Sequence, residues 1–404
     1  MDAKITGSII ASFRKSANLT QAELAKNLNV SDKTVSKWES GRGYPEITQL
    51  HALAQFFGVS VDYLLTGERN GITVAGSIIV DTVKNISTYP EKGMLSIISS
   101  LNKAAGGCAP NTAIDLARID RSIPVSVAGC VGDDDNGSFI VGVMQKNGVN
   151  TGQIVVTSET ATSFSDVMSL KSGERTFFSF RGANDVFSPE HINLAKLDCK
   201  ILHIGYILML AKFDAPDDEY GTVMARFLHS VREKGIKTSI DVVSSSDEDY
   251  KATIIPALKY ADYAIMNEVE SGMLTDLPPY NEDGSINTEN IKKTMEFMAA
   301  AGTREKVIIH CKQCGFCLDV QSGEFTVVPS LEIPPEEIKG SVGAGDAYCA
   351  GCLYALYNGF DDTRMLEFAS ASAACNLFSE NPTDSMRSRE EIEKLATVYG
   401  RKKI

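Results

Sequence analysis

The apolar positions of the first 65 residues have the spacing of short helices. Leu24, Ala25 and Leu28 would share one face of a first helix, and Val35 and Trp38 would share one face of a second. β-branched runs are almost absent from this part of the chain, so strands are not expected there. The pattern predicts an all-helical N-terminal segment.

The ends of these two helices carry their own signals. Thr20, with Glu23 three positions later, has the form of a capping box, and Ser31 is a favourable cap for the following helix. Only a short connection through Asn29 and Val30 separates the two helices. Two helices joined so closely cross steeply, which leaves the second one accessible to the major groove of DNA.

From residue 72 onward, short apolar strand patterns alternate with helical ones. The expected strands are ITVAG, VSVAG, KILHIG, KTSIDVV, DYAIMN and KVIIHC, and the expected helices span 109–119, 216–234 and 290–301. This alternation is typical of an α/β fold with a doubly wound parallel sheet. The polar segment 66–71 separates the two patterns, so we predict two domains, residues 1–68 and 72–400.

Charge distinguishes the two predicted domains. The chain has a net charge of −13. Residues 1–68 hold seven basic and seven acidic side chains, so the whole negative excess falls in residues 69–404. Only the helical segment is therefore expected to approach a phosphate backbone without general repulsion.

The sequence shows no apolar run of the roughly 18 residues that a membrane span needs, and its first residues do not have the pattern of a secretory signal. We therefore expect a cytoplasmic protein with reduced thiols. Cys311, Cys314 and Cys317 form C-x-x-C-x-x-C, but no fourth metal ligand lies nearby in the sequence. We interpret them as a thiol cluster.

The run TQAELA, the segment VSDKTVSKWE and the following G-R-x-x-P resemble the Cro/repressor-type (XRE family) helix-turn-helix domains over about residues 5–66. The resemblance implies binding to a double-stranded DNA operator. The contacts would come from Gln21, Asp32, Lys33, Thr34, Ser36 and Lys37. Among these, Asp32 can accept a hydrogen bond from cytosine but would repel phosphate. A small helical bundle used for dimerisation is the alternative.

The segment KGSVGAGDAYCAG, residues 339–351, places small residues directly before an expected helix. The N–H groups of Gly343, Ala344 and Gly345 would face an anion with the helix dipole behind them. Asp346 follows in the first turn, where a carboxylate can take the proton of a hydroxyl that attacks phosphorus. A Walker A loop is excluded because it needs Lys and Ser or Thr where this chain has Asp and Ala. An ordinary glycine-rich turn is the alternative.

Two segments, AAGGCAPNTA at 104–113 and AGCVGDDDNG at 128–137, precede this motif. The first places a double glycine before a helix, as needed where backbone approaches a polyhydroxy ligand. In this order, the three motifs resemble the PfkB/ribokinase family of carbohydrate kinases over about residues 72–395. The resemblance implies a ribokinase-like sandwich with a small β lid, ATP and Mg²⁺ as cofactors, a sugar as substrate, and pairing into a homodimer.

The resemblance also assigns roles to single residues. Asp346 would be the catalytic base, and Asn267 and Glu270 of an N-x-x-E element would hold water-coordinated Mg²⁺ beside ATP. The sugar would be bound by Asp81, Gly106, Gly107, Asn111 and Arg175. The residues alone leave alternatives open, because N-x-x-E also caps helices and the arginine can be a solvated turn charge.

The chain departs from the family pattern at the cation, nucleotide and sugar sites. The departures are Gly340 for Asp, Ser341 and Val342 for two threonines, His310, Cys311 and Lys312 for Thr-Leu-Gly, and Ile79 for Asn. The first two leave open whether a monovalent cation binds.

The sequence therefore predicts a sugar kinase with an attached sequence-specific DNA-binding domain that acts as a sugar-responsive regulator. Two alternatives stay open, a transcription factor whose kinase-like domain only senses a sugar or phosphosugar, and a kinase whose helical module serves oligomerisation. The sugar is not identified, since fructose, ribose, a keto-deoxy acid and a nucleoside all fit a pocket built from Asp81, two glycines and Asn111.

Overall fold

The computed structural model describes residues 2–170, 174–244 and 249–404. The chain forms two compact units, Met1–Gly71 with Asn193–Lys200, and Ile72–Ile192 with Ile201–Ile404. Within the first unit, the Ser60 N–H donates a 2.8 Å hydrogen bond to the Asp198 carboxylate. The helical unit therefore includes a short segment that is far away in the sequence.

The first unit contains five helices around a small apolar core. They are α1 (Ala3–Ser16), α2 (Gln21–Asn27), α3 (Asp32–Glu39), α4 (Ile47–Phe57) and α5 (Val61–Thr66). The capping box of Thr20 and Glu23 is confirmed, and the Ser31 hydroxyl accepts the N–H of Thr34 at the start of α3. Val35 and Trp38 are buried as predicted. The apolar residues that have helical spacing in the sequence therefore form this core.

The second unit is organised around a nine-stranded sheet. Its strands, in spatial order, are β15 (Phe325–Pro329), β14 (Cys314–Asp319), β13 (Lys306–His310), β12 (Tyr263–Asn267), β11 (Lys237–Val242), β8 (Ile201–Ile207), β1 (Ile72–Gly76), β4 (Val125–Gly132) and β5 (Asn150–Thr157). All neighbouring pairs from β13 to β5 are parallel, and β14 and β15 add antiparallel strands at one edge. The predicted parallel α/β sheet is confirmed.

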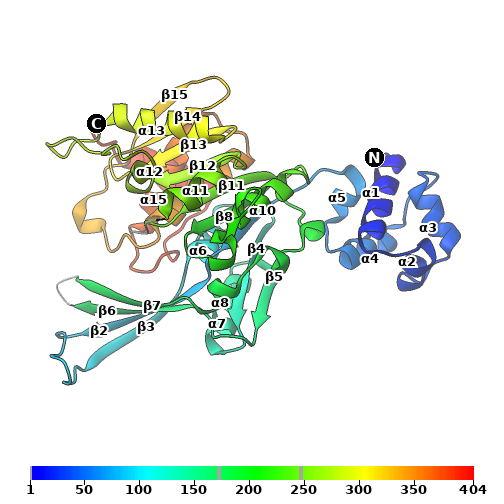
Figure 1. Cartoon of the computed structure of the whole chain (residues 1–404), viewed down its shortest axis with the longest axis horizontal. Coiled ribbons are helices and arrows are strands. Elements are labelled where there is room, and N and C mark those ends of the chain that lie inside the picture. Colours follow the sequence, from blue (N-terminus) through cyan, green and yellow to red (C-terminus); the bar gives the residue numbers. More distant parts are fainter. Residues whose placement is uncertain (1, 171–173, 245–248) are drawn as a thin grey trace. The chain divides into compact units, whose positions relative to one another are not determined.

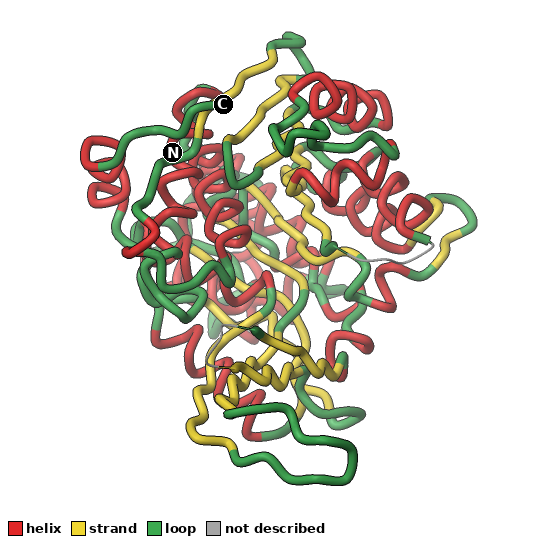
Figure 2. The backbone as a smooth tube through the Cα atoms, turned by 90° about the vertical axis from the view of Figure 1, so that its left-hand side faces the viewer, coloured by secondary structure: helices red, strands yellow, loops and turns green. Residues whose placement is uncertain are grey.

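Two groups of helices pack on this sheet (Figure 2). One group is α6 (Cys108–Ile119), α7 (Asp135–Lys146), α14 (Ala344–Tyr357), α15 (Asp362–Asn376) and α16 (Arg389–Val398). The other is α8 (Gly182–Val186), α9 (Ala211–Asp214), α10 (Val223–Arg232), α11 (Tyr250–Leu258), α12 (Glu268–Thr275) and α13 (Thr288–Ala301). Short 3₁₀ turns lie at Pro189–His191, Leu194–Lys196 and Pro335–Glu337. No helix in the described part of the chain is long and apolar enough to cross a membrane.

A separate four-stranded sheet projects from the α/β unit at the lower left of Figure 1. Its strands, in spatial order, are β3 (Ile98–Gly106), β2 (Ile79–Ile86), β6 (Phe164–Leu170) and β7 (Arg175–Phe180). The structure therefore contains the small β lid that the family resemblance implied.

The helix predicted at 216–234 is wrong in its first third. Residues Pro216–Asp217 and Gly221–Thr222 form a small antiparallel pair, β9 and β10, and α10 begins only at Val223. Asp217 holds this turn because its Oδ1 accepts the N–H groups of Glu219 and Tyr220. This bonding of a side chain to nearby backbone N–H groups favours a turn over a helix.

The order of the strands reverses between β1 and β8. The chain proceeds from β1 to β4 and β5 on one side, and from β8 to β11, β12 and β13 on the other. In open α/β sheets, ligands bind beyond the carboxyl ends of the strands at such a reversal. A ligand site is therefore expected beside the residues at the carboxyl ends of β1 and β8.

Candidate active site and DNA-binding surface

Asp346 lies in the first turn of α14 and is only 4% exposed. Its Oδ2 accepts a 2.8 Å hydrogen bond from Asn111 Nδ2 and lies 3.5 Å from the hydroxyl of Tyr206. Burial raises the pKa of Asp346 to about 7, and the charge of Asp241 acts in the same direction against these hydrogen bonds. A carboxyl group that titrates near neutral pH is suited to accept a proton during a reaction.

The turn before Asp346 has the conformation that its glycine permits. Gly343 has a φ of 83°, and a Cβ at this position would lie 2.7 Å from Pro382 Cβ. The Ala344 N–H already donates to the Ser341 carbonyl at 3.2 Å, so an anion would have to compete for this amide. The N-terminus of α14 nevertheless directs the positive end of its dipole at this turn.

Four of the five predicted sugar-binding residues, Asp81, Gly106, Gly107 and Asn111, lie on or directly beside β2, β3 and α6. A Cβ on Gly106 would lie 2.2 Å from Asp81 Oδ2, so only glycine admits the carboxylate at this distance. Gly107 has a φ of 84° and leads directly into α6, which carries Asn111. Burial raises the pKa of Asp81 to about 6. The structure thus brings Asp81 to Gly106, and Asn111 to Asp346.

Sequence reasoning missed two residues of this site, Tyr206 and Asp241. Tyr206 has a φ of 59°, which is rare for a residue other than glycine, and its N–H donates a 2.6 Å hydrogen bond to Asp241 Oδ1. Residues with such strained backbone conformations are often found at functional sites. A signal was present, because both residues lie near the carboxyl ends of predicted strands.

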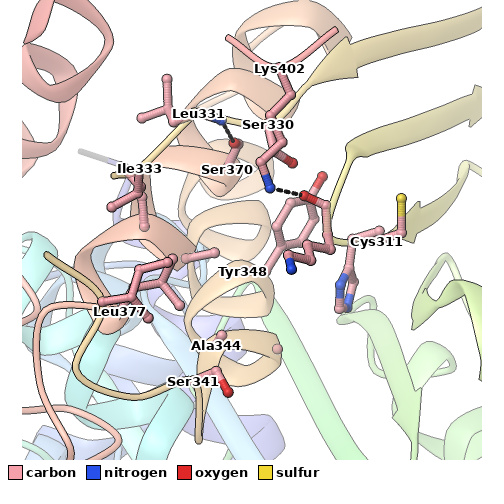
Figure 3. Close-up of a pocket in the computed structure, with 16 residues that line it drawn as sticks. Cys311, Ser330, Leu331, Ile333, Ser341, Ala344, Tyr348, Ser370, Leu377 and Lys402 are labelled. Carbon is pink, nitrogen blue, oxygen red and sulfur yellow. Dashed lines mark hydrogen bonds between the residues drawn. The ribbon is translucent and has the colours of Figure 1, made fainter. Parts of the chain in front are cut away.

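A pocket of about 460 Å³ lies beside the N-terminal half of α14 (Figure 3). It is lined by His310, Cys311, Lys312, Ser330, Leu331, Ile333, Ile338, Ser341, Ala344, Gly345, Tyr348, Ser370, Ala373, Ala374, Leu377 and Lys402. The ring of His310 stacks on Tyr348 with centroids 4.6 Å apart, and burial lowers the pKa of His310 to about 4. The pocket combines apolar walls with the ammonium groups of Lys312 and Lys402, a lining suited to a molecule that joins an apolar ring to anionic groups.

Four lining residues, His310, Cys311, Lys312 and Ser341, are among the positions at which the sequence departs from the family pattern. The ammonium group of Lys402 donates a 2.7 Å hydrogen bond to the Lys312 carbonyl, which brings the C-terminal residues to this pocket. Lys402 carries no sequence signal that could have placed it here. Four of the seven departures therefore gather at this pocket, whereas Ile79 lies on β2 in the lid.

Asn267 and Glu270 form a complete capping box at the start of α12. Asn267 Oδ1 accepts the N–H of Glu270, and the Glu270 carboxylate accepts the N–H of Asn267 and the hydroxyl of Ser244. Burial raises the pKa of Glu270 to about 7, and the charge of Asp241 acts in the same direction. The pair therefore caps α12, and the carboxylate of Glu270 is buried close enough to Asp241 to be affected by its negative charge.

Arg175, the remaining residue predicted to bind sugar, opens β7 in the lid, where its backbone pairs with Ser169. Its side chain lies outside the described residues.

In the helical unit, most of the predicted DNA contacts line one hollow of about 450 Å³. Its residues are Gln21, Asp32, Lys33, Ser36, Lys37, Ser40 and Arg42. Gln21 donates a 2.8 Å hydrogen bond to Glu39, which also pairs with Arg14. Thr34 is placed at the cap of α3, where its hydroxyl lies 2.8 Å from that of Ser31. Arg42 was missed, although it belongs to the G-R-x-x-P segment that supported the resemblance.

The two units of the chain match the profiles of two different protein families. The helix-turn-helix profile matches residues 10–64. The HTH-type transcriptional activator BcrR of Enterococcus faecalis is 44% identical over 77 residues, which cover 19% of this chain and 37% of that protein. The helical unit is therefore a helix-turn-helix domain.

The α/β unit resembles kinases of small sugars. A 5-dehydro-2-deoxygluconokinase of Shouchella clausii is 24% identical over 307 residues, 73% of this chain and 87% of that protein. The Arabidopsis thaliana ribokinase, solved with ribose and ATP, shares the fold with a TM-score of 0.68 and 20% identity over 81% of this chain and 98% of that one. The profile of pfkB family carbohydrate kinases matches residues 70–389, and the chain therefore belongs to this family.

Proposed function

We propose that the α/β unit transfers the γ-phosphoryl group of ATP to a hydroxyl group of a sugar or sugar-like alcohol. The observation that carries the proposal is the buried pair of Asp346 and Asn111 at the N-terminus of α14, beside the 460 Å³ pocket. A base that titrates near neutral pH then lies next to a helix terminus that favours phosphate. ATP would occupy the pocket.

Asp346 acts on the substrate hydroxyl. As the hydroxyl oxygen attacks the γ-phosphorus, its O–H bond breaks and the proton passes to an oxygen of Asp346, while the bond between the γ-phosphorus and the bridging oxygen breaks and ADP leaves. Asn111 orients the carboxylate through its Nδ2. The Oδ1 of Asn111 is buried and has no partner among the described residues, so it is available to accept a hydroxyl of the substrate.

Asp81 supplies the second acceptor for the substrate. Its carboxylate lies against Gly106 on the lid side of the site, where it can accept hydrogen bonds from neighbouring hydroxyl groups of a sugar. Asp81 lies on the lid strand β2, and Gly106 ends β3, its antiparallel partner. Exclusion of water by a lid would protect the phosphoryl group from hydrolysis, the side reaction that a kinase must suppress.

The oxygens of Asn267 and Glu270 fit Mg²⁺, which prefers hard oxygen ligands and usually keeps several of its waters. Since both side chains already serve the cap of α12, they would hold the ion through water. When bound, Mg²⁺ neutralises charge on the ATP phosphates. A structure of a ribokinase-like protein of E. coli contains ATP and Mg²⁺, which supports this pairing of cofactors.

A substrate panel tests the proposed activity. Full-length protein with ATP and Mg²⁺ is incubated with ketoses, aldoses, keto-deoxy sugar acids and nucleosides, and ADP and phosphorylated products are quantified by mass spectrometry. We expect at least one compound to acquire a phosphoryl group in step with ADP formation. Sugar binding in calorimetry without any phosphorylated product would instead support a sensor without kinase activity.

The pH dependence of turnover follows from Asp346. The base must be ionised, and its pKa is raised to about 7, so kcat should rise as the pH increases through about 7 and level off above it. The measurement is a kcat profile from pH 5 to pH 9, on the order of a hundredfold range in proton activity on each side of pH 7. The residual turnover of Asp346→Asn should lack this rise, whereas any effect of ATP's own titration would remain in the variant.

Glu270→Gln should raise the Mg²⁺ concentration needed for half-maximal turnover by about tenfold, because removing an outer-sphere partner commonly weakens metal binding by 10–100-fold. Glu268→Gln is the matched control, since Glu268 lies in the same helical turn and bonds Tyr280. If the Mg²⁺ titration of Glu270→Gln equals that of wild type, Asn267 and Glu270 only cap α12 and do not hold the ion.

We further propose that the helix-turn-helix domain binds a palindromic operator as part of a homodimer, and that the sugar changes this affinity. Support comes from the hollow on α2 and α3 and from the balanced charge of residues 1–68. One such module makes few phosphate contacts, so useful affinity favours two half-sites read together. If sugar alters DNA affinity, then operator DNA must alter sugar affinity by the same factor.

A further inference from the structure

A second cluster of side chains lies behind Asp346. It consists of His203 on β8, Asp241 on β11 and Cys349 on α14, and each of them is at most 8% exposed. One nitrogen, one carboxylate oxygen and one sulfur from these residues all lie within 4.8 Å of one another. Three segments that are distant in the sequence thus present an imidazole, a carboxylate and a thiol to the same point.

Two of the three distances within this triad match those expected around a metal ion. His203 Nε2 lies 3.5 Å from Asp241 Oδ2 and 3.6 Å from Cys349 Sγ. The first distance exceeds the roughly 2.7–3.2 Å of an N–H···O hydrogen bond. Tetrahedral Zn²⁺, with bonds of about 2.0–2.1 Å to nitrogen and oxygen and 2.3 Å to sulfur, separates N from S by about 3.6 Å and N from O by about 3.4 Å.

His203 and Asp241 each have a second polar atom, and this atom contacts a group outside the triad. His203 Nδ1 lies 2.9 Å from the hydroxyl of Ser239, which leaves Nε2 for the triad. Asp241 Oδ1 accepts the N–H of Tyr206 at 2.6 Å, which leaves Oδ2. Metal-binding histidines and carboxylates are commonly oriented by such outer partners. The triad is therefore held in position from both adjacent strands.

We propose that His203, Asp241 and Cys349 form a zinc site separate from the magnesium of the nucleotide. A thiolate and an imidazole favour Zn²⁺ over Mg²⁺, which prefers oxygen ligands. On binding, Cys349 releases its proton to solvent and forms the sulfur–zinc bond. Without the ion, burial raises the pKa of the Cys349 thiol well above its ordinary value, so the residue stays neutral.

Such an ion would connect the sheet to the helix that carries the base. Cys349 follows Asp346 by three residues on α14, and Asp241 also holds the backbone of Tyr206, whose hydroxyl faces Asp346. The zinc would therefore position the catalytic carboxylate and would not contact substrate. Its removal should lower the melting temperature, because folding and metal binding are coupled.

Cobalt provides the test, because a thiolate bound to Co²⁺ gives an intense charge-transfer band in the near ultraviolet. Metal-free full-length protein is titrated with Co²⁺ and then with Zn²⁺. We expect one equivalent of cobalt to produce the band and zinc to abolish it. Cys349→Ser should lack the band, and Cys352→Ser, a buried cysteine one turn further along the same helix, should keep it.

The competing location is the pair of Cys311 and Cys314, whose sulfurs lie 3.7 Å apart. A band that survives Cys349→Ser but is lost in Cys311→Ser would overturn the proposal, as would the absence of any cobalt uptake. If Cys349→Ser does not fold, zinc K-edge X-ray absorption of the wild-type protein identifies the atoms that bind the metal. One sulfur with one imidazole supports the triad, and two sulfurs assign the metal to the other cysteines.

Discussion

Asp346→Asn should lower kcat by about 10²–10⁴-fold, the usual contribution of a general base. The amide keeps the shape of the carboxylate and an oxygen that can accept the 2.8 Å hydrogen bond from Asn111, but it cannot take up a proton from the substrate. Sugar affinity should therefore change little. The measurement is the steady-state kinetics of the best compound from the panel, with sugar affinity determined by calorimetry.

Asp262→Asn is the matched control for this variant. Asp262 is also a buried carboxylate, but it lies before β12 and accepts the N–H of Thr238. Its replacement should cost stability and leave kcat close to wild type. Turnover of Asp346→Asn equal to that of wild type would show that Asp346 is not the base.

Although Asp346→Asn should lower kcat, it should stabilise the folded protein at pH values above 7. The folded-state pKa of Asp346 is raised to about 7, above the roughly 3.9 of an unfolded aspartate, so its contribution to stability is present at low pH and is lost as the pH rises through 7. A neutral amide does not ionise. Asp346→Asn should therefore raise the melting temperature at pH 8 relative to wild type, and this gain should disappear at pH 4.

Replacement of both Lys33 and Lys37 by alanine should abolish most of the binding to the operator. Both line the hollow on α3, where they can neutralise phosphates. Each lost phosphate contact lowers the dependence of log K on log salt by about 0.9, so two half-sites with two lysines each should lose a slope of about 3.6. The measurement is a binding titration at several salt concentrations, and kinase turnover should stay unchanged.

Lys26→Ala serves as the matched control, because Lys26 is exposed at the end of α2 and does not line the hollow. Its removal should leave the slope nearly unaffected. The operator is first found by selection from genomic DNA fragments with the full-length protein, with and without the sugar. Recovery of no enriched sequence in either condition would contradict the regulatory role and leave a kinase with a helical appendage.

Local sequence signals determined the elements of this protein. The capping box at Thr20, the inward positions Val35 and Trp38, and the alternation of apolar strands with helices each depend on residues within one or two turns of each other. Such short-range preferences act before tertiary contacts form, so the sequence was sufficient to predict them. It also indicated the motif around Asp346, because glycine before a helix has a local conformational cause.

The chemistry of the site was decided only by the tertiary structure. The pKa of Asp346 depends on burial and on Asp241, which is more than a hundred residues away, and the Tyr206 and Asp241 contact joins two separate strands. The attachment of Asn193–Lys200 to the helical unit is equally invisible to local patterns. Desolvation and electrostatic interaction depend on distance in space and not on spacing in the chain, so no sequence motif could state them in advance.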